Sequence, residues 1–161
     1  MLKDSGAIRE FRTGAVRDIA EGKGRCDLLP LEIIAKLLKD DRVLNWLHRY
    51  VRFGGNLTLY NAIETFVETH PHWNNMETAI LEVSKQYEEG AKKYSERNWE
   101  KGIPVHCFID SATRHYLKWR RGNDDEPHDR AFVWNILGAI WTHHYKPELI
   151  DLPFAEKEDE Q

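Results

Sequence analysis

Two carboxylates stand at the start of a predicted helix, on the side that carries its apolar residues. Pro127 suits the first helical turn, because its missing N–H would have no partner there. Asp129 precedes Val133 by four residues and therefore falls on the buried face, and Glu126 lies one turn earlier. A carboxylate that faces a core is costly unless a metal ion, a cationic side chain or backbone donors compensate it.

The E-x-x-D spacing of Glu126 and Asp129 would allow both carboxylates to bind one hard cation. A preceding helix carries three further glutamates, which an antiparallel packing would bring to the same place. The candidate metal ligands are Glu82, Glu88, Glu89, Glu126 and Asp129. Ligand sets made only of oxygen favour Mg²⁺, with Mn²⁺ as an alternative, and Mg²⁺ usually accompanies a phosphate-bearing substrate. A solvated acidic face beside a helix N-terminus is the competing interpretation.

Basic side chains interleave with these carboxylates, as a triphosphate–metal complex requires. They are Lys93, Arg114, His115 and Lys118 on the helices, and Arg17 and Lys23 in a glycine-punctuated N-terminal arm. Glycines among basic residues let backbone N–H groups approach an anion. An i, i+4 ion pair of Asp110 with Arg114, and a structural role for His115, are the simpler readings.

Helical periodicity dominates the rest of the sequence, and no strand pattern of useful length appears. The spacing predicts helices over 31–38, 42–52, 58–68, 75–94, 106–121 and 126–144. Asn75 should cap the fourth helix, and Asp124 or Asp125 the sixth. We therefore expect an all-α helical bundle in one domain, residues 1–161. It has an arm (1–30), accessory helices (31–75), core helices (76–144) and an acidic tail (153–161).

Composition narrows the class of protein. The 161 residues suffice for one domain with a core, and the net charge of −4 argues against a nucleic-acid polymer as partner. Two cysteines, Cys26 and Cys107, exclude a disulfide framework. No signal peptide or membrane-spanning run is evident, so we expect a cytoplasmic protein of a bacterium or a phage-infected host.

Several motifs, in order, resemble the phage-type dATP/dGTP diphosphohydrolase family, which is related to the MazG-like all-α nucleotide pyrophosphatases. They are the arm from Arg9 to Pro30, the segment Tyr87–Tyr94, the segment Asn98–Pro104, Arg114-His115 and Trp134-Asn135. The resemblance implies Mg²⁺-dependent hydrolysis of purine deoxynucleoside triphosphates to the monophosphate and pyrophosphate. It also implies a homo-oligomer.

The resemblance also implies roles for individual residues. Glu126 and Asp129 match the E-x-x-D metal motif, whereas Lys85 stands where an E-x-x-E motif beginning at Glu82 would need its second glutamate. The expected catalytic residues are Glu89, Glu126, Lys93, Arg114 and His115. The expected substrate-binding residues are Arg17, Lys23, Asn98, Trp99, Lys118 and Asn135. A nucleotide-binding regulatory module without turnover, and a helical protein-interaction domain, are the alternative functions.

Overall fold

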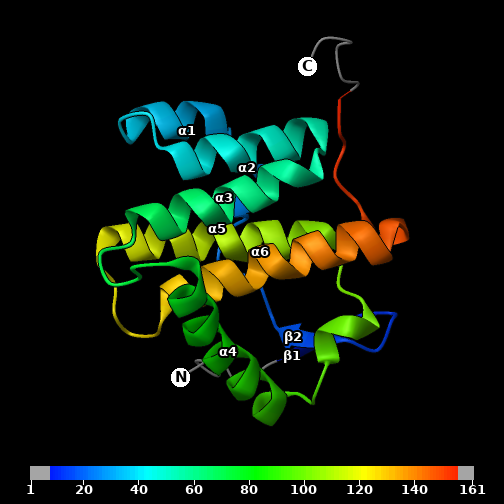
Figure 1. Ribbon diagram of the computed structural model, residues 1–161. Helices are drawn as coiled ribbons and strands as arrows, with labels where there is room; N and C mark the ends of the chain where they lie inside the picture. Colours follow the sequence, from blue (N-terminus) through cyan, green and yellow to red (C-terminus); the bar gives the residue numbers. More distant parts are fainter. Residues whose placement is uncertain (1–7, 156–161) are drawn as a thin grey trace.

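The computed structural model describes residues 8–155, and α-helices make up most of them (Figure 1). The helices are α1 (Leu31–Leu37), α2 (Arg42–Phe53), α3 (Asn56–Thr69), α4 (Met76–Lys93), α5 (Val105–Arg121) and α6 (His128–Tyr145). Short 3₁₀ helices are η1 (Cys26–Leu28), η2 (Asn98–Lys101) and η3 (Pro147–Leu149). The predicted all-α bundle is confirmed, and the ends of the six helices lie within two residues of their predicted positions.

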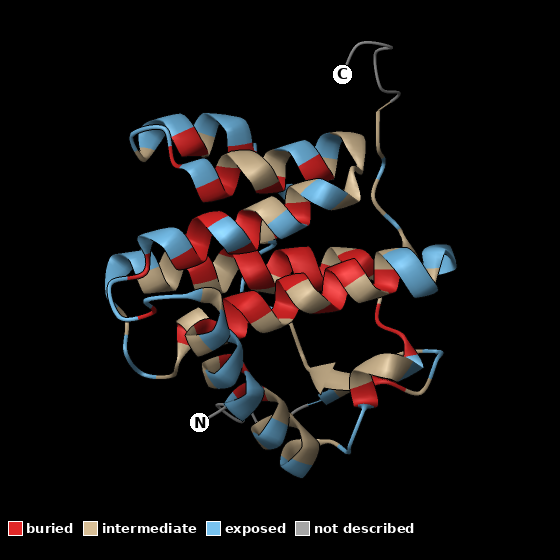
Figure 2. Ribbon diagram, in the orientation of Figure 1, coloured by how far each residue is buried: buried red, intermediate tan, exposed pale blue. Residues whose placement is uncertain are grey.

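The centre of the bundle is the pair α5 and α6, which lie side by side and carry more buried residues than any other two helices (Figures 1 and 2). A six-residue connection makes them antiparallel neighbours. Gly138 allows the close approach, because a Cβ there would lie 2.4 Å from the Phe108 ring. Side chains projecting from this pair are therefore held on a rigid support.

One side of the central pair is covered by α1, α2 and α3 (Figure 1). Asp41 caps α2 by accepting a hydrogen bond from the Leu44 N–H at 2.8 Å. Phe154 lies at the start of the predicted acidic tail and packs against Tyr50 at 5.4 Å between ring centroids. The remainder of that tail, residues 156–161, lies outside the described residues.

The other side holds α4 and the arm (Figure 1). Asn75 caps α4 as predicted, accepting from the Thr78 N–H at 2.8 Å. Within the arm, the strands β1 (Ile8–Glu10) and β2 (Val16–Asp18) form an antiparallel hairpin. The sequence did not indicate these strands, since three residues are too few to show alternation.

The sixth helix begins later than predicted, which corrects the geometry of the carboxylate pair. The helix starts at His128, and Pro127 is its N-cap without a side-chain capping bond, so neither Asp124 nor Asp125 caps it. Glu126 precedes the helix and Asp129 lies within its first turn. The two carboxylates are therefore not neighbours on one helical face.

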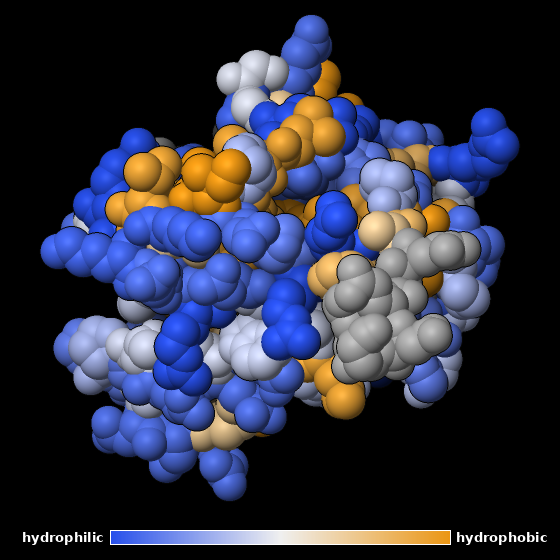
Figure 3. Space-filling model, turned by 90° about the horizontal axis from the view of Figure 1, so that it is seen from above, coloured by the Kyte–Doolittle hydropathy of each residue, from blue (hydrophilic) through white to orange (hydrophobic). Residues whose placement is uncertain are grey.

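The surface outside the bundle core is mostly hydrophilic. Seen from the side of α1 and α2, it also carries separate apolar patches (Figure 3). Ile33 and Leu37 of α1 are exposed. No helix in the described part of the chain combines the length and apolar character needed to cross a membrane.

Candidate active site

A cavity of about 930 Å³ lies between the arm, the C-terminal half of α4, η2, and α5 with the start of α6. Its volume falls in the range of small-molecule sites. Most residues predicted to act on a substrate line this cavity: Arg17, Lys23, Lys93, Asn98, Trp99, Arg114, His115, Lys118, Glu126 and Asn135. The structure thus brings together residues separated by more than a hundred positions in the sequence.

The arm is fastened to form one wall of the cavity. The Asn98 side chain clamps Val16, accepting from its N–H and donating to its carbonyl, both at 2.9 Å. Asp18 pairs with Lys93 at 3.0 Å and accepts from the Tyr94 hydroxyl at 3.1 Å. Both ends of the Asn98 amide are therefore engaged with the arm, which assigns this residue a positioning role.

Trp99 belongs to an aromatic part of the wall. Its ring meets Trp141 at 5.1 Å and Tyr87 at 6.0 Å, and Tyr87 also contacts Trp134 at 5.9 Å. The two contacts of Trp99 are edge to face, a favourable arrangement at these distances. This end of the cavity is accordingly the part suited to a flat heterocycle.

Arg17 lies at the floor of the cavity between α5 and α6. It donates to Ser111 Oγ at 3.0 Å and to Asn135 Oδ1 at 3.1 Å. Burial lowers the pKa of Arg17, yet a guanidinium remains charged in proteins. Its Nη1 atom is buried and has no hydrogen-bond partner among residues 8–155. A fixed cation with a spare donor is a suitable contact for an anion.

Further cations surround Arg17. Partial burial lowers the pKa of Lys23, and the nearby charges of Arg114, Lys118 and Arg17 lower it further, although Asp18 opposes them. Arg114 is held by Asp110 at 2.7 Å. Like charges gathered in this way repel one another, and a polyanion would relieve the repulsion.

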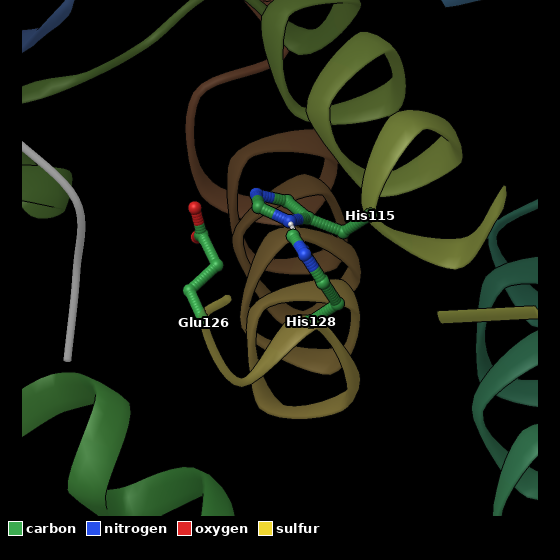
Figure 4. Close-up of side chains that lie close together, drawn as sticks. All are labelled: His115, Glu126 and His128. Atoms are coloured by element: carbon green, nitrogen blue, oxygen red, sulfur yellow. Dashed lines mark hydrogen bonds between the residues drawn. The ribbon is translucent and has the colours of Figure 1, made fainter. Parts of the chain in front are cut away.

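A histidine–carboxylate group lies beside the cationic cluster. His115 of α5 and His128 of α6 meet with their Nδ1 atoms 2.9 Å apart (Figure 4). The Nε2 atom of His128 lies 2.8 Å from Asp125 Oδ1. Burial lowers the pKa of His115 to about 3, with smaller contributions from His128 and Arg17, so this imidazole is neutral near pH 7.

Glu126 completes this group. One ligand atom from each of His115, Glu126 and His128 lies within 4.8 Å of the others, and these residues are the one such set found in the described part of the chain. No hydrogen bond or ion pair engages the Glu126 carboxylate within residues 8–155. An uncompensated carboxylate beside two imidazoles can bind a cation or accept a proton.

The other predicted metal ligands do not join this group, and each lies beside a basic side chain, although Glu88 also lines the cavity. Glu82 pairs with Lys85 at 2.7 Å, and Glu88 lies 3.8 Å from Lys92, both on the exposed side of α4. The remaining two pairs are Glu89 with Arg130 at 3.2 Å and Asp129 with His70 at 2.8 Å.

Glu89, Glu126 and Asp129 also border a shallow depression next to the cavity. Their oxygen atoms do not gather there at the spacing of ligands to a single ion, as far as the described residues show. Asp129 is compensated by hydrogen bonds, because it lies 2.8 Å from His70 Nε2 and accepts from the Arg130 N–H at 2.8 Å.

Sequence reasoning missed three residues of this site. Asp125 and His128 are spaced i, i+3, which could have marked them as a pair across the helix start. Gln86 is buried on α4 and lines the cavity, and its Oε1 has no hydrogen-bond partner in the part of the chain described. Gln86 follows Ala79 by seven residues and Val83 by three, and this helical spacing could have placed it on the buried face of α4.

Fold and site together define an all-α domain whose cavity joins a cationic cluster to a histidine–carboxylate edge. Residues 65–151, more than half of the 161-residue chain, match the family described as dATP/dGTP diphosphohydrolase, N-terminal. The chain belongs to this family. The matched range holds α4, η2, α5 and α6, while the arm precedes it. Neither the curated proteins nor the solved structures contain a match to this chain.

Proposed function

We infer that the chain hydrolyses dATP or dGTP to the deoxynucleoside monophosphate and pyrophosphate, in the presence of Mg²⁺. The observation that carries this proposal is the cavity that places Arg17, Lys23, Arg114 and Lys118 beside the uncompensated carboxylate of Glu126. A triphosphate needs several cations for its oxygens, and its hydrolysis needs a group that positions and deprotonates water. The family description supports the same substrate class.

The cations and the aromatic wall suggest how the substrate lies. Arg17, Lys23, Arg114 and Lys118 would hold the phosphates, and the base would lie toward Tyr87 and the other aromatic residues. Because Arg17 and Arg114 are fixed by Asn135 and Asp110, their donors are oriented before the substrate binds. Such preorganised charges stabilise a transition state without a further ordering cost.

In the proposed reaction, water adds to the α-phosphorus and the bond from that phosphorus to the α,β-bridging oxygen breaks. Pyrophosphate leaves with the bridging oxygen, and Glu126 accepts the proton of the attacking water. Mg²⁺ bound to the triphosphate would neutralise charge on the phosphate oxygens and lower the pKa of a bound water. Glu126 and Asp125 fit this ion, because Mg²⁺ in proteins is usually bound by one or two carboxylates plus phosphates.

A product assay across the deoxy- and ribonucleoside triphosphates tests this function. Release of pyrophosphate with the monophosphate from dATP or dGTP is expected, and stepwise release of inorganic phosphate would contradict it. A homo-oligomeric assembly in the cytoplasm is part of the same proposal, and light scattering of the purified chain would measure the assembly.

A nucleotide-binding module without turnover is the second candidate. It is favoured by the ion pairs of Glu82, Glu88, Glu89 and Asp129, which engage four of the five carboxylates expected to hold Mg²⁺. Tight binding of dGTP without any product would support this candidate over the hydrolase.

A further inference from the structure

We propose that His115, Glu126 and His128 form a binding site for a divalent transition-metal ion of the series from Mn²⁺ to Zn²⁺. One ligand atom from each of the three residues lies within 4.8 Å of the others. Any role of the ion in hydrolysis rests on the proposed function. The binding of the ion, however, can be measured without any nucleotide.

The two imidazoles are positioned as ligands of one ion. Their Nδ1 atoms are 2.9 Å apart, and two nitrogen ligands at roughly 2.0–2.1 Å from one tetrahedral ion are separated by about 3.3 Å, so the rings need to part only slightly. His115 projects from α5 and His128 from α6, the helices of the rigid central pair (Figure 4). The ion would replace the hydrogen bond that now joins the two rings, with little movement of the backbone.

A second interaction orients one of these rings. Asp125 lies 2.8 Å from His128 Nε2, on the side of the ring away from His115. A proton on Nε2 that is donated to Asp125 leaves the Nδ1 lone pair directed at His115 and the ion. Metal-binding histidines usually make this hydrogen bond to a carboxylate through their other nitrogen. The His128 side chain is fully buried, so the orientation is fixed by packing as well.

The charges match a divalent ion. The carboxylates of Glu126 and Asp125 supply two negative charges beside the two imidazoles. One oxygen of Glu126 would bind the ion while the other remains available to a water molecule. Three protein ligands leave coordination positions for water or a phosphate oxygen, as in catalytic zinc sites.

The ligand types also select the ion. Imidazole suits Zn²⁺, Fe²⁺, Ni²⁺ and related ions, whereas Mg²⁺ prefers oxygen ligands only. A competing explanation is a structural hydrogen bond in which the two histidines share one proton. That explanation predicts no metal affinity, which separates it from a metal site.

Cobalt titration of the chelator-treated full chain tests the site, by visible absorption and by calorimetry, without nucleotide. We expect one equivalent of Co²⁺ to bind with a d–d absorption band, and Mg²⁺ to bind at least 100-fold more weakly. His115→Asn and Glu126→Gln, which alter partly exposed side chains, should each weaken Co²⁺ binding by on the order of 100-fold. Asp125→Asn should weaken it by roughly 10-fold to 100-fold. His144→Asn alters an exposed histidine near the end of α6 and should change nothing.

Absence of Co²⁺ binding to the wild-type chain would overturn the proposal, and so would binding that survives both His115→Asn and Glu126→Gln. Hydrolysis of dGTP is measured on the same samples. Co²⁺ binding through these residues without hydrolysis would support the metal site and contradict the proposed function. Hydrolysis with Mg²⁺ and no Co²⁺ binding would contradict the metal site and support the function.

Discussion

Two histidine–carboxylate pairs lie near the start of α6, and their surroundings give them different properties. In the first pair, His128 and Asp125 are 2.8 Å apart, and the ring also meets His115 at the edge of the cavity. The second pair is His70 with Asp129, also 2.8 Å apart. The distance between histidine and carboxylate therefore does not distinguish them.

Aromatic packing encloses the second pair. Trp73 stacks on the His70 ring at 3.9 Å between centroids with the planes 3° apart, and Trp119 lies at 5.5 Å on the same ring. The His72 N–H donates to His70 Nδ1 at 3.1 Å, so both ring nitrogens are engaged. This pair ties the segment between α3 and α4 to α6, and the His70 ring offers no nitrogen to a ligand.

The first pair differs because it adjoins a second imidazole and the uncompensated Glu126 carboxylate, both on the cavity. A residue type alone therefore does not define a site here. A histidine–carboxylate pair is a candidate for a functional role when groups without hydrogen-bond partners lie beside it and line a cavity.

Replacement of Glu126 should give the largest effect. Glu126→Gln keeps the size of the side chain but removes its charge and its basicity, so kcat for dGTP should fall by roughly 100-fold to 1,000-fold. The melting temperature should stay unchanged, since no hydrogen bond or ion pair of the described residues engages this carboxylate. Steady-state kinetics and thermal unfolding measure the two quantities. If Glu126→Gln hydrolysed dGTP with the kcat of the wild type, the two pairs would not differ in function.

Replacement of Asp129 should instead reduce stability. Asp129→Asn removes the charge that faces His70, and the unfolding free energy should fall by about 1–3 kcal/mol, the usual cost of disturbing a buried charged hydrogen bond. Turnover per folded molecule should persist. Urea unfolding measures the loss, with exposed His72→Asn as the control. A large fall in kcat at unchanged stability would restore Asp129 as the metal ligand that its spacing with Glu126 predicted.

Replacement of Lys118 should weaken substrate binding without lowering the stability of the fold. Lys118→Met should raise KM by about tenfold, or roughly 1.4 kcal/mol, through loss of one phosphate contact. Stability should not fall, because Lys118 repels Lys23. A fall in stability together with an unchanged KM would show that Lys118 is a structural residue.

The same variant makes a pH prediction. Protonated Lys23 binds phosphate, so its contribution is present below its pKa and is lost as pH rises through it. Lys118 is among the charges that lower this pKa, and its removal should move the loss of affinity to higher pH. A titration of KM against pH in wild type and variant measures the shift, and no shift would exclude the electrostatic coupling.

The helices could be predicted because each one buries a periodic apolar face. Asn75 even identified the start of α4. The beginning of α6 was harder, since Pro127 is compatible with a first turn or with the residue before it, and this choice decides where Glu126 points. A shift of two residues thus separated the two carboxylates.

Contacts between distant residues could not be predicted from one sequence. His70 reaches Asp129 across 59 positions, and Asn98 reaches Val16 across 82. Local spacing carries no information on such pairs. It does indicate the Asp125–His128 pair, because these residues are three positions apart. The cationic residues of the cavity could be predicted as a group, because several basic side chains were expected together. That prediction did not require the hydrogen-bond partner of each one.

Replacement of Glu82 should have the smallest effect and tests the N-terminal half of α4. Its side chain is 38% exposed and pairs with Lys85, itself 55% exposed, and exposed ion pairs contribute little to stability. Glu82→Gln should change the unfolding free energy by less than about 0.5 kcal/mol and leave kcat unaltered. Glu89→Gln is the matched comparison, because Glu89 lies two turns along α4 and faces Arg130 on α6. If Glu82→Gln lowered kcat as Glu126→Gln should, the metal ligands would extend along α4, and the histidine–carboxylate edge alone would not account for the site.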